Sequence, residues 1–251
     1  MTEEAIRRAA DALLDARRNG TTLTALPEEL RPQTQADAYA VQDVMAEAFG
    51  EIGGWKIGAP TAEATPGFAP MPTAWIAGSG ALLSGSRWRY RGLEAEIAFL
   101  VGRDLPPREE PYTLEHVLDA MASCHPAIEV LESAFLAPST VDRLSMTADL
   151  QIHGGFVYGG SIANWRSIHW SAERVTLAVD GSVRVDCVGS NTSGDLLRLL
   201  PWLANEGATR TGGLRKGQWI TTGSWTGNTP GAAGSTVDVR FESAGVVSLH
   251  F

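Results

Sequence analysis

Two glutamates separated by one residue stand at the start of an apolar segment, residues 93–101, which reads L-E-A-E-I-A-F-L-V. The tail of this segment predicts a β-strand. Because side chains alternate between the two faces of a strand, Glu94 and Glu96 should point to the same side. Two ionised carboxylates so close together repel each other unless a cation lies between them. Mg²⁺ is such a cation, since it takes one or two protein carboxylates and completes its shell with water or substrate oxygens. The alternative is a solvated strand face.

A third carboxylate stands inside another apolar strand, residues 127–131, which reads A-I-E-V-L. Glu129 is flanked there by Ile128 and Val130, and burying a carboxylate without a partner is costly. We therefore expect Glu129 to join Glu94 and Glu96. Glu132 is the weaker candidate, because it would point to the opposite face if the strand continued.

A lysine within a short apolar segment is the candidate cation from the protein itself. Lys56 lies in residues 53–58, G-G-W-K-I-G, with glycines on both sides. A lysine in a half-buried strand needs a carboxylate or an anionic ligand as its partner. The alternative is a surface lysine whose stem covers apolar side chains.

Two further segments carry polar groups that could meet a ligand. In residues 146–160, Asp149, Gln151 and His153 alternate, so all three could share one face. His153 could shuttle protons near neutral pH, although a structural histidine is the alternative. In the turn T-T-G-S-W-T-G, residues 221–227, Ser224 and Thr226 offer hydroxyls beside backbone N–H groups, which suits an anionic group.

The elements that must position these residues follow from the hydrophobic pattern. Helices over residues 3–18 and 36–49, with Thr2 and Thr34 as caps, form a small helical part, residues 1–52. Residues 53–251 form a β-rich body. Within it we expect a loop over the site at residues 59–80, helices at 113–123 and 195–205, a hairpin at 174–188, and strands at 235–241 and 245–251.

Composition bounds the class of protein. The chain has 251 residues, a formal net charge of -9 and no basic run, which argues against nucleic acid and anionic membranes as partners. We see no segment with the length of a membrane span or of a signal peptide. Cys124 and Cys187 are too few for a disulfide framework or a zinc cluster. We therefore expect a soluble cytoplasmic protein.

Several of these motifs occur together, and in the same order, in one known family. They are G-W-K-I-G at 54–58, E-A-E-I-A-F at 94–99, A-I-E-V at 127–130, Ala148-Asp149 before a Gly-Gly strand, W-L-A-N at 202–205 and T-G-S-W-T-G at 222–227. Over nearly its whole length the chain resembles the fumarylacetoacetate hydrolase superfamily. Within that superfamily it is most similar to the 2-keto-4-pentenoate hydratase and 4-oxalocrotonate decarboxylase branch, which serves aromatic meta-cleavage pathways.

The resemblance implies an α+β fold, a mixed β-sheet roll of the fumarylacetoacetase C-terminal-domain type with a small helical N-terminal part, assembled as a homo-oligomer. It implies Mg²⁺ or Mn²⁺ held by Glu94, Glu96 and Glu129. It also places Lys56 close to a 2-oxo acid substrate that chelates the metal. The implied reaction is addition of water to a 2-hydroxydienoate, with Lys56 as the first candidate for proton transfer.

Two departures from the family pattern lie around the substrate. The acidic residue that the resemblance predicts in the loop after the lysine is absent, and Gly67 stands there in the segment P-G-F-A-P. The usual A-D-N-x-S run is here A-D-L-Q-I-H, so Gln151 and His153 could reshape the pocket or supply the missing acid–base group.

Three other functions stay open. A decarboxylase acting on 2-oxo-3-hexenedioate would need a cation for the second carboxylate, and Arg143 and Arg166 are the arginines nearby in sequence. A C–C hydrolase of an acylpyruvate would need a base to activate water, for which His153 is the candidate. The third alternative, of another class, is a 2-oxo acid binding protein without catalytic activity.

Overall fold

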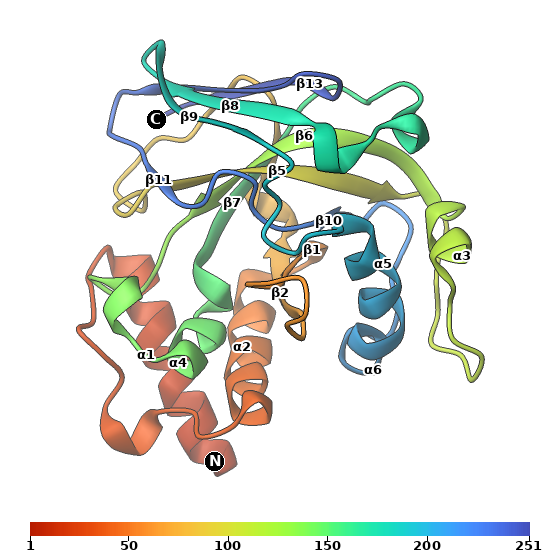
Figure 1. Ribbon diagram of the computed structural model, residues 1–251. Helices are drawn as coiled ribbons and strands as arrows, with labels where there is room; N and C mark the ends of the chain where they lie inside the picture. Colours follow the sequence, from red (N-terminus) through yellow and green to blue (C-terminus); the bar gives the residue numbers. More distant parts are fainter.

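The computed structural model describes the backbone of residues 1–251 and the side chains of all residues except 208 and 209. Two mixed β-sheets lie above a set of helices (Figure 1). The large sheet has the order β2-β1-β10-β5-β6-β7-β3, with β11 paired to β5, and the small sheet has the order β4-β13-β12-β8-β9.

The strands of the large sheet are β1 (Ile52–Gly58), β2 (Gly67–Pro72), β3 (Ile76–Gly78), β5 (Gly92–Val101), β6 (Met121–Leu131), β7 (His153–Tyr158), β10 (Trp219–Thr221) and β11 (Thr229–Pro230). Those of the small sheet are β4 (Ala81–Leu82), β8 (Arg174–Val179), β9 (Ser182–Val188), β12 (Thr236–Phe241) and β13 (Gly245–His250). The helices are α1 (Glu3–Asn19), α2 (Gln35–Phe49), α3 (Leu114–Leu118), α4 (Arg143–Ala148), α5 (Leu199–Trp202) and α6 (Ala208–Thr211).

The large sheet is strongly curved. Although β2 and β7 are separated by four strands in the sheet order, they contact each other, so the sheet curls toward a barrel. Met71, Ala98, Ala127, Phe156 and Trp219 form a buried apolar cluster from strands around this curve. The other face of the large sheet contributes to the main core, which contains Phe99 of β5 together with buried side chains of β8, β12 and β13.

The N-terminal helices pack below the sheets and have their own apolar cluster (Figure 1). The caps predicted from the sequence are confirmed: the Thr2 side chain accepts from the Ala5 N–H, and Thr34 and Asp37 form a capping box. Leu13 and Met45 are fully buried where α1 and α2 meet. The predicted domain boundary between residues 52 and 53 falls within β1, after its first residue, and stays a prediction.

Two element predictions were wrong. The expected loop at residues 59–80 contains β2 and β3. Its prolines, Pro70 and Pro72, are compatible with a strand because β2 is an edge strand of the sheet, where a missing N–H is tolerated. The expected helix at residues 113–123 stops at Leu118, and Met121 already begins β6. Pro126, expected to terminate that helix, instead pairs with Ile97 within the sheet. The predicted hairpin and the two terminal strands are confirmed.

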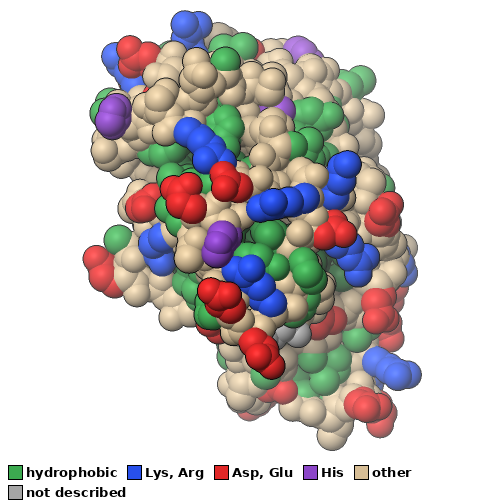
Figure 2. Space-filling model, turned by 90° about the vertical axis from the view of Figure 1, so that its right-hand side faces the viewer, with side chains coloured by type: hydrophobic (Ala, Val, Ile, Leu, Met, Phe, Trp, Pro, Cys, Tyr) green, Lys and Arg blue, Asp and Glu red, His purple; other side chains and the backbone are tan. Residues whose placement is uncertain are grey.

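The helices in the part of the chain that the structure describes do not include one with the length and apolar character needed to cross a membrane. On the face seen in Figure 2, acidic and basic side chains are interspersed rather than gathered by sign. That face therefore carries no extended basic patch among the side chains that are described.

Candidate metal centre and substrate cavity

The three carboxylates predicted from the sequence lie together. Glu94 on β5 is paired directly with Glu129 on β6, and Glu96 follows two residues later on the same face of β5. One carboxylate oxygen from each residue lies within 4.8 Å of the other two. Glu96 and Glu129 are buried, with 2% and 0% exposure. The sheet register, with the alternation of side chains, therefore builds a three-carboxylate cluster.

Two of the carboxylates are fixed by hydrogen bonds from neighbouring strands. Oε2 of Glu96 accepts hydrogen bonds from the Thr221 hydroxyl and from the Gly223 N–H, at the end of β10. Oε1 of Glu129 accepts from Lys56 Nζ at 2.7 Å and lies 2.8 Å from Nδ1 of His153. Oε2 of Glu129 is buried and has no hydrogen-bond partner among the described residues.

Burial and mutual repulsion keep the three carboxylates from ionising together. Burial and the neighbouring Glu129 raise the pKa of Glu94 to about 7. The same two causes, with Glu94, raise the pKa of Glu96 well above its ordinary value. Burial alone would also raise the pKa of Glu129, but Lys56 and His153 lower it to about 2. Glu129 is thus the most readily ionised of the three carboxylates, while the raised pKa values of Glu94 and Glu96 favour their protonated forms.

The cluster fits a hard divalent cation. Three carboxylates supply oxygen donors of the type that Mg²⁺ prefers, and the unpartnered Oε2 of Glu129 is a buried acceptor without a donor. Because one oxygen from each residue lies within 4.8 Å of the other two, a single cation can take one oxygen from each after the side chains move together.

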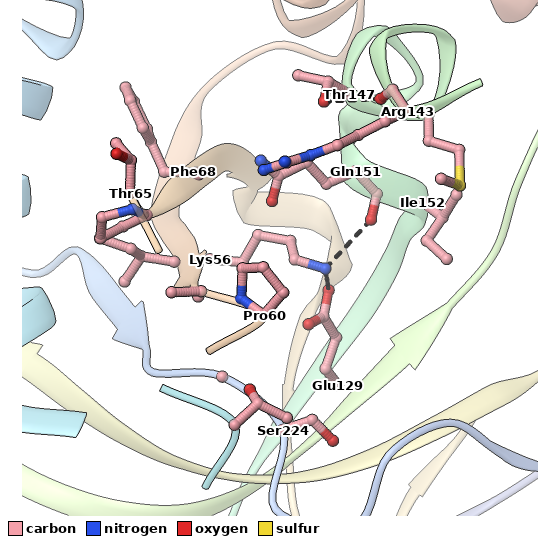
Figure 3. A pocket seen from close by; sticks show the side chains of 18 of the residues that line it. Lys56, Pro60, Thr65, Phe68, Glu129, Arg143, Thr147, Gln151, Ile152 and Ser224 are labelled. Atoms are coloured by element: carbon pink, nitrogen blue, oxygen red, sulfur yellow. Dashed lines mark hydrogen bonds and ion pairs between the residues drawn. The ribbon is translucent and has the colours of Figure 1, made fainter. Parts of the chain in front are cut away.

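Lys56 projects from β1 toward the carboxylates, which supply the anionic partner expected for a lysine in this apolar segment. Its Nζ donates to Glu129 and, at 3.2 Å, to the backbone oxygen of Gln151 (Figure 3). Burial would lower the pKa of Lys56, but Glu129, Glu94 and Glu96 raise it above the ordinary value. Lys56 is therefore an ammonium that lies on the cavity wall.

The cavity has a volume of about 940 Å³, a size that accepts a small organic acid with room to spare. The predicted site residues that line it are Lys56, Glu94, Glu96, Glu129, Gln151 and Ser224. Thr226 is not among the lining residues. Its hydroxyl instead accepts from the Ala95 N–H and lies near the Gly227 oxygen, so the predicted substrate contact from Thr226 is replaced by a structural one.

Gln151 enters the cavity from an unusual turn. Leu150, Gln151 and Ile152 all have positive φ angles, between 50° and 56°, although none of them is a glycine. Such residues cost roughly 1 kcal/mol or more each, so surrounding contacts must hold the turn. Arg17 does so by donating to the Asp149 carboxylate and to the backbone oxygens of Asp149 and His153. The turn presents the Gln151 carbonyl to Lys56 and its side chain to the cavity.

The structure separates the other polar residues that were expected to share a face. His153 is fully buried behind Glu129 and is not among the lining residues, so it does not meet substrate as a proton shuttle or as the base of a C–C hydrolase. Burial lowers its pKa. Asp149 turns toward Arg17, and Glu132 accepts from the N–H groups of Arg89 and Tyr90, away from the cluster.

Several lining residues were not predicted from the sequence. Tyr39 of α2, Phe68 of β2 and Trp202 of α5 form an aromatic wall, with ring centroids 5.2 Å and 5.9 Å from Phe68. No sequence signal links them, because they come from three distant segments. Of the two arginines considered for a second carboxylate, Arg143 lines the cavity, whereas Arg166 pairs with Asp119 on the surface. Figure 3 shows the Arg143 guanidinium extending over Gln151.

No model of a known protein family matches the chain. It is 28% identical over 255 residues to a 2-keto-4-pentenoate hydratase of Dechloromonas aromatica (strain RCB), covering 97% of this chain and 96% of that protein. It is 25% identical over 262 residues to the 4-oxalocrotonate decarboxylase of Pseudomonas sp. (strain CF600), covering 100% and 98%.

Among solved structures, that of a 4-oxalocrotonate decarboxylase from Pseudomonas putida, complexed with magnesium and adipate, matches with a TM-score of 0.87. The two chains are 26% identical, and the match covers 100% of this chain and 98% of the other. The α+β fold predicted from the sequence is thereby confirmed.

Proposed function

We propose that this chain, which belongs to the 2-keto-4-pentenoate hydratase and 4-oxalocrotonate decarboxylase branch of the fumarylacetoacetate hydrolase superfamily, is a divalent-metal-dependent hydratase. Its substrate would be a 2-hydroxydienoate of the 2-keto-4-pentenoate type, and the enzyme is a hydro-lyase. The observation that carries the proposal is the cluster of Glu94, Glu96 and Glu129 on the wall of a cavity that also receives Lys56.

Glu94, Glu96 and Glu129 would hold the metal, which we propose to be Mg²⁺ or Mn²⁺. When bound, the metal supplies Lewis acidity to the carboxylate and 2-oxo oxygens of the substrate. Thr221 and Gly223 keep the Glu96 carboxylate in place, so this ligand needs little reorganisation. Ser224 and the Gln151 carboxamide line the same cavity and are the proposed polar contacts of the substrate.

Lys56 is the proposed acid in proton transfer. Its ammonium is held between Glu129 and the Gln151 carbonyl, and it borders the cavity where the substrate carbons would lie. Positioned proton transfer of this kind contributes about 10²- to 10⁴-fold to a rate. A carboxamide at Gln151 does not exchange protons as a carboxyl does. Lys56 therefore takes the role that the resemblance gives to an acidic residue near Gly67.

Arg143 favours one second candidate, decarboxylation of 2-oxo-3-hexenedioate. An arginine on the cavity wall could pair with a carboxylate at the far end of such a substrate. No hydrogen bond or ion pair from the Arg143 side chain occurs among the described residues, so it is available to a ligand. A related decarboxylase is complexed with adipate, which is itself a dicarboxylate.

Turnover of metal-stripped protein distinguishes these functions. We would add Mg²⁺ or Mn²⁺, supply 2-hydroxypenta-2,4-dienoate or 2-oxo-3-hexenedioate, and identify products by NMR. Metal-dependent formation of a 4-hydroxy-2-oxo acid from the dienoate supports the hydratase. Release of CO₂ from the dicarboxylate, lost in Arg143→Met, supports the decarboxylase. Metal binding without turnover of either substrate would leave a binding protein without catalysis.

Two further features of the chain are proposals. Relatives in this branch are metabolic enzymes by name, so we propose a cytoplasmic location. We also propose assembly into a homo-oligomer, as the resemblance implies. Sedimentation of the purified protein would test the second proposal directly, because a monomer would sediment with the mass of a single chain of 26.7 kDa.

A further inference from the structure

The two carboxylate oxygens of Glu129 have different surroundings. Oε1 accepts from Lys56 Nζ at 2.7 Å and lies at hydrogen-bond distance, 2.8 Å, from His153 Nδ1. Oε2 is buried and receives no hydrogen bond from the described residues. This asymmetry leaves Oε2 as the oxygen of Glu129 that is available to a cation shared with Glu94 and Glu96.

His153 makes this contact from a place that substrate does not reach. The side chain has 0% exposure and is not among the residues that line the cavity. Its ring lies against Trp75, with the centroids 5.9 Å apart. Its second nitrogen, Nε2, has no hydrogen-bond partner among the described residues. The polar interaction of this buried ring is therefore directed to Glu129.

We propose that His153 is a positioning residue that fixes the rotation of the Glu129 carboxylate, so that Oε2 faces the metal. Lys56 alone would not fix it, because an ammonium on a flexible four-carbon stem can follow either oxygen. The imidazole is confined instead, since it is buried with 0% exposure and its ring lies against Trp75. Groups that orient metal ligands in this way contribute substantially to affinity. The inference rests on the metal site of the proposed function and not on the reaction.

A comparison of two similar variants tests this role. In His153→Asn the amide nitrogen lies close to the place of Nδ1, whereas in His153→Gln it lies one bond farther from the backbone. We would measure the Kd for Mn²⁺ by counting free ion with electron paramagnetic resonance. His125→Asn is the matched control, because His125 is a buried histidine whose Nδ1 contacts the Gly159 oxygen instead.

We expect His153→Asn to bind Mn²⁺ within about threefold of the wild type and His153→Gln to bind it about 10- to 100-fold more weakly. His125→Asn should keep the wild-type affinity. Equal affinities in both His153 variants would overturn the inference, as would an equal loss in His125→Asn. For a variant too unstable for this titration, the Mn²⁺-induced rise in Tm provides the same ranking. Absence of Mn²⁺ binding in the wild type would overturn the metal site itself, whereas absence of turnover would overturn only the hydratase.

Discussion

The carboxamide of Gln151 occupies the space beside Gly67. A Cβ atom at position 67 would lie 2.7 Å from Nε2 of Gln151, closer than such atoms approach in proteins. Nε2 is the far end of a flexible side chain, so it could move aside without disturbing the backbone. Glycine at position 67 and glutamine at position 151 therefore complement each other on the wall of the cavity.

This relationship gives the first prediction. Gly67→Ala should displace the Gln151 carboxamide and raise KM for the dienoate by roughly tenfold, because small misplacements of positioning groups are costly. Gln151→Ala should have a similar effect, and the double variant should be no worse than either. Steady-state kinetics on the three variants measure this. Losses that multiply in the double variant would show that the two residues act independently.

Lys56 should matter for chemistry more than for metal binding. In Lys56→Met we expect kcat/KM to fall by about 10²- to 10⁴-fold, the range for loss of positioned proton transfer. Mn²⁺ should still bind, because removing a cation beside Glu129 lowers the repulsion that the metal meets. Kinetics and a Mn²⁺ titration on the same sample separate the two effects. Full turnover in Lys56→Met would remove its proposed role.

Metal affinity should depend on pH through Glu94. Its pKa is about 7 in the metal-free protein, so below that pH a proton must leave before the metal binds. Affinity should therefore rise with pH at least up to about 7, and the raised pKa of Glu96 extends this rise. The metal-free protein should show the opposite trend in stability: a carboxyl whose pKa is raised by folding binds more protons folded than unfolded. Unfolding free energy should therefore fall as pH rises from about 4.5 toward 7.

Mn²⁺ titrations and denaturant unfolding at several pH values together test how the protonation of Glu94 affects metal affinity and stability. A Glu94→Gln variant is the control, since it removes the titrating group and should flatten the stability trend that Glu94 causes. Affinity that is independent of pH between about 5.5 and 7 would contradict the raised pKa.

Arg17 should stabilise the fold around the site. Its side chain is 6% exposed and donates to Asp149 and to the backbone oxygens of Glu132 and His153. Arg17→Met should lower the unfolding free energy by about 3 kcal/mol or more, because it leaves a buried carboxylate without its cation. Arg18→Met, one residue along the same helix and exposed, should change it by no more than about 0.5 kcal/mol. Urea denaturation measures the unfolding free energy of both variants. Equal losses in the two would contradict the stabilising role of Arg17.

The sequence was enough to predict that Glu94, Glu96 and Glu129 lie together. The alternation of Glu94 and Glu96 follows from strand geometry, and Glu129 was recognisable as a carboxylate among apolar neighbours. What remained hidden was the register that pairs Glu94 with Glu129, because it depends on contacts between strands. The hydrogen-bond donors to Glu96 lie more than a hundred residues away, so no local pattern could assign them.

The wall of the cavity was less predictable. Leu, Gln and Ile do not favour positive φ angles, so the left-handed turn at residues 150–152 has no signal in the residue types. It exists because Arg17, from the first helix, holds its flanking residues. The alternating pattern left His153 open as a proton shuttle or a structural histidine. The turn breaks that alternation and buries the ring.

The most direct test of the account is a Mn²⁺ titration of metal-stripped protein and of four single variants. Glu94→Gln, Glu96→Gln and Glu129→Gln each remove a proposed ligand, while Glu132→Gln removes a buried carboxylate that faces away from the cluster. We predict one Mn²⁺ per chain in the wild type and in Glu132→Gln, and an affinity at least about tenfold weaker in the other three. Undiminished binding in the three cluster variants would contradict the three-carboxylate metal site.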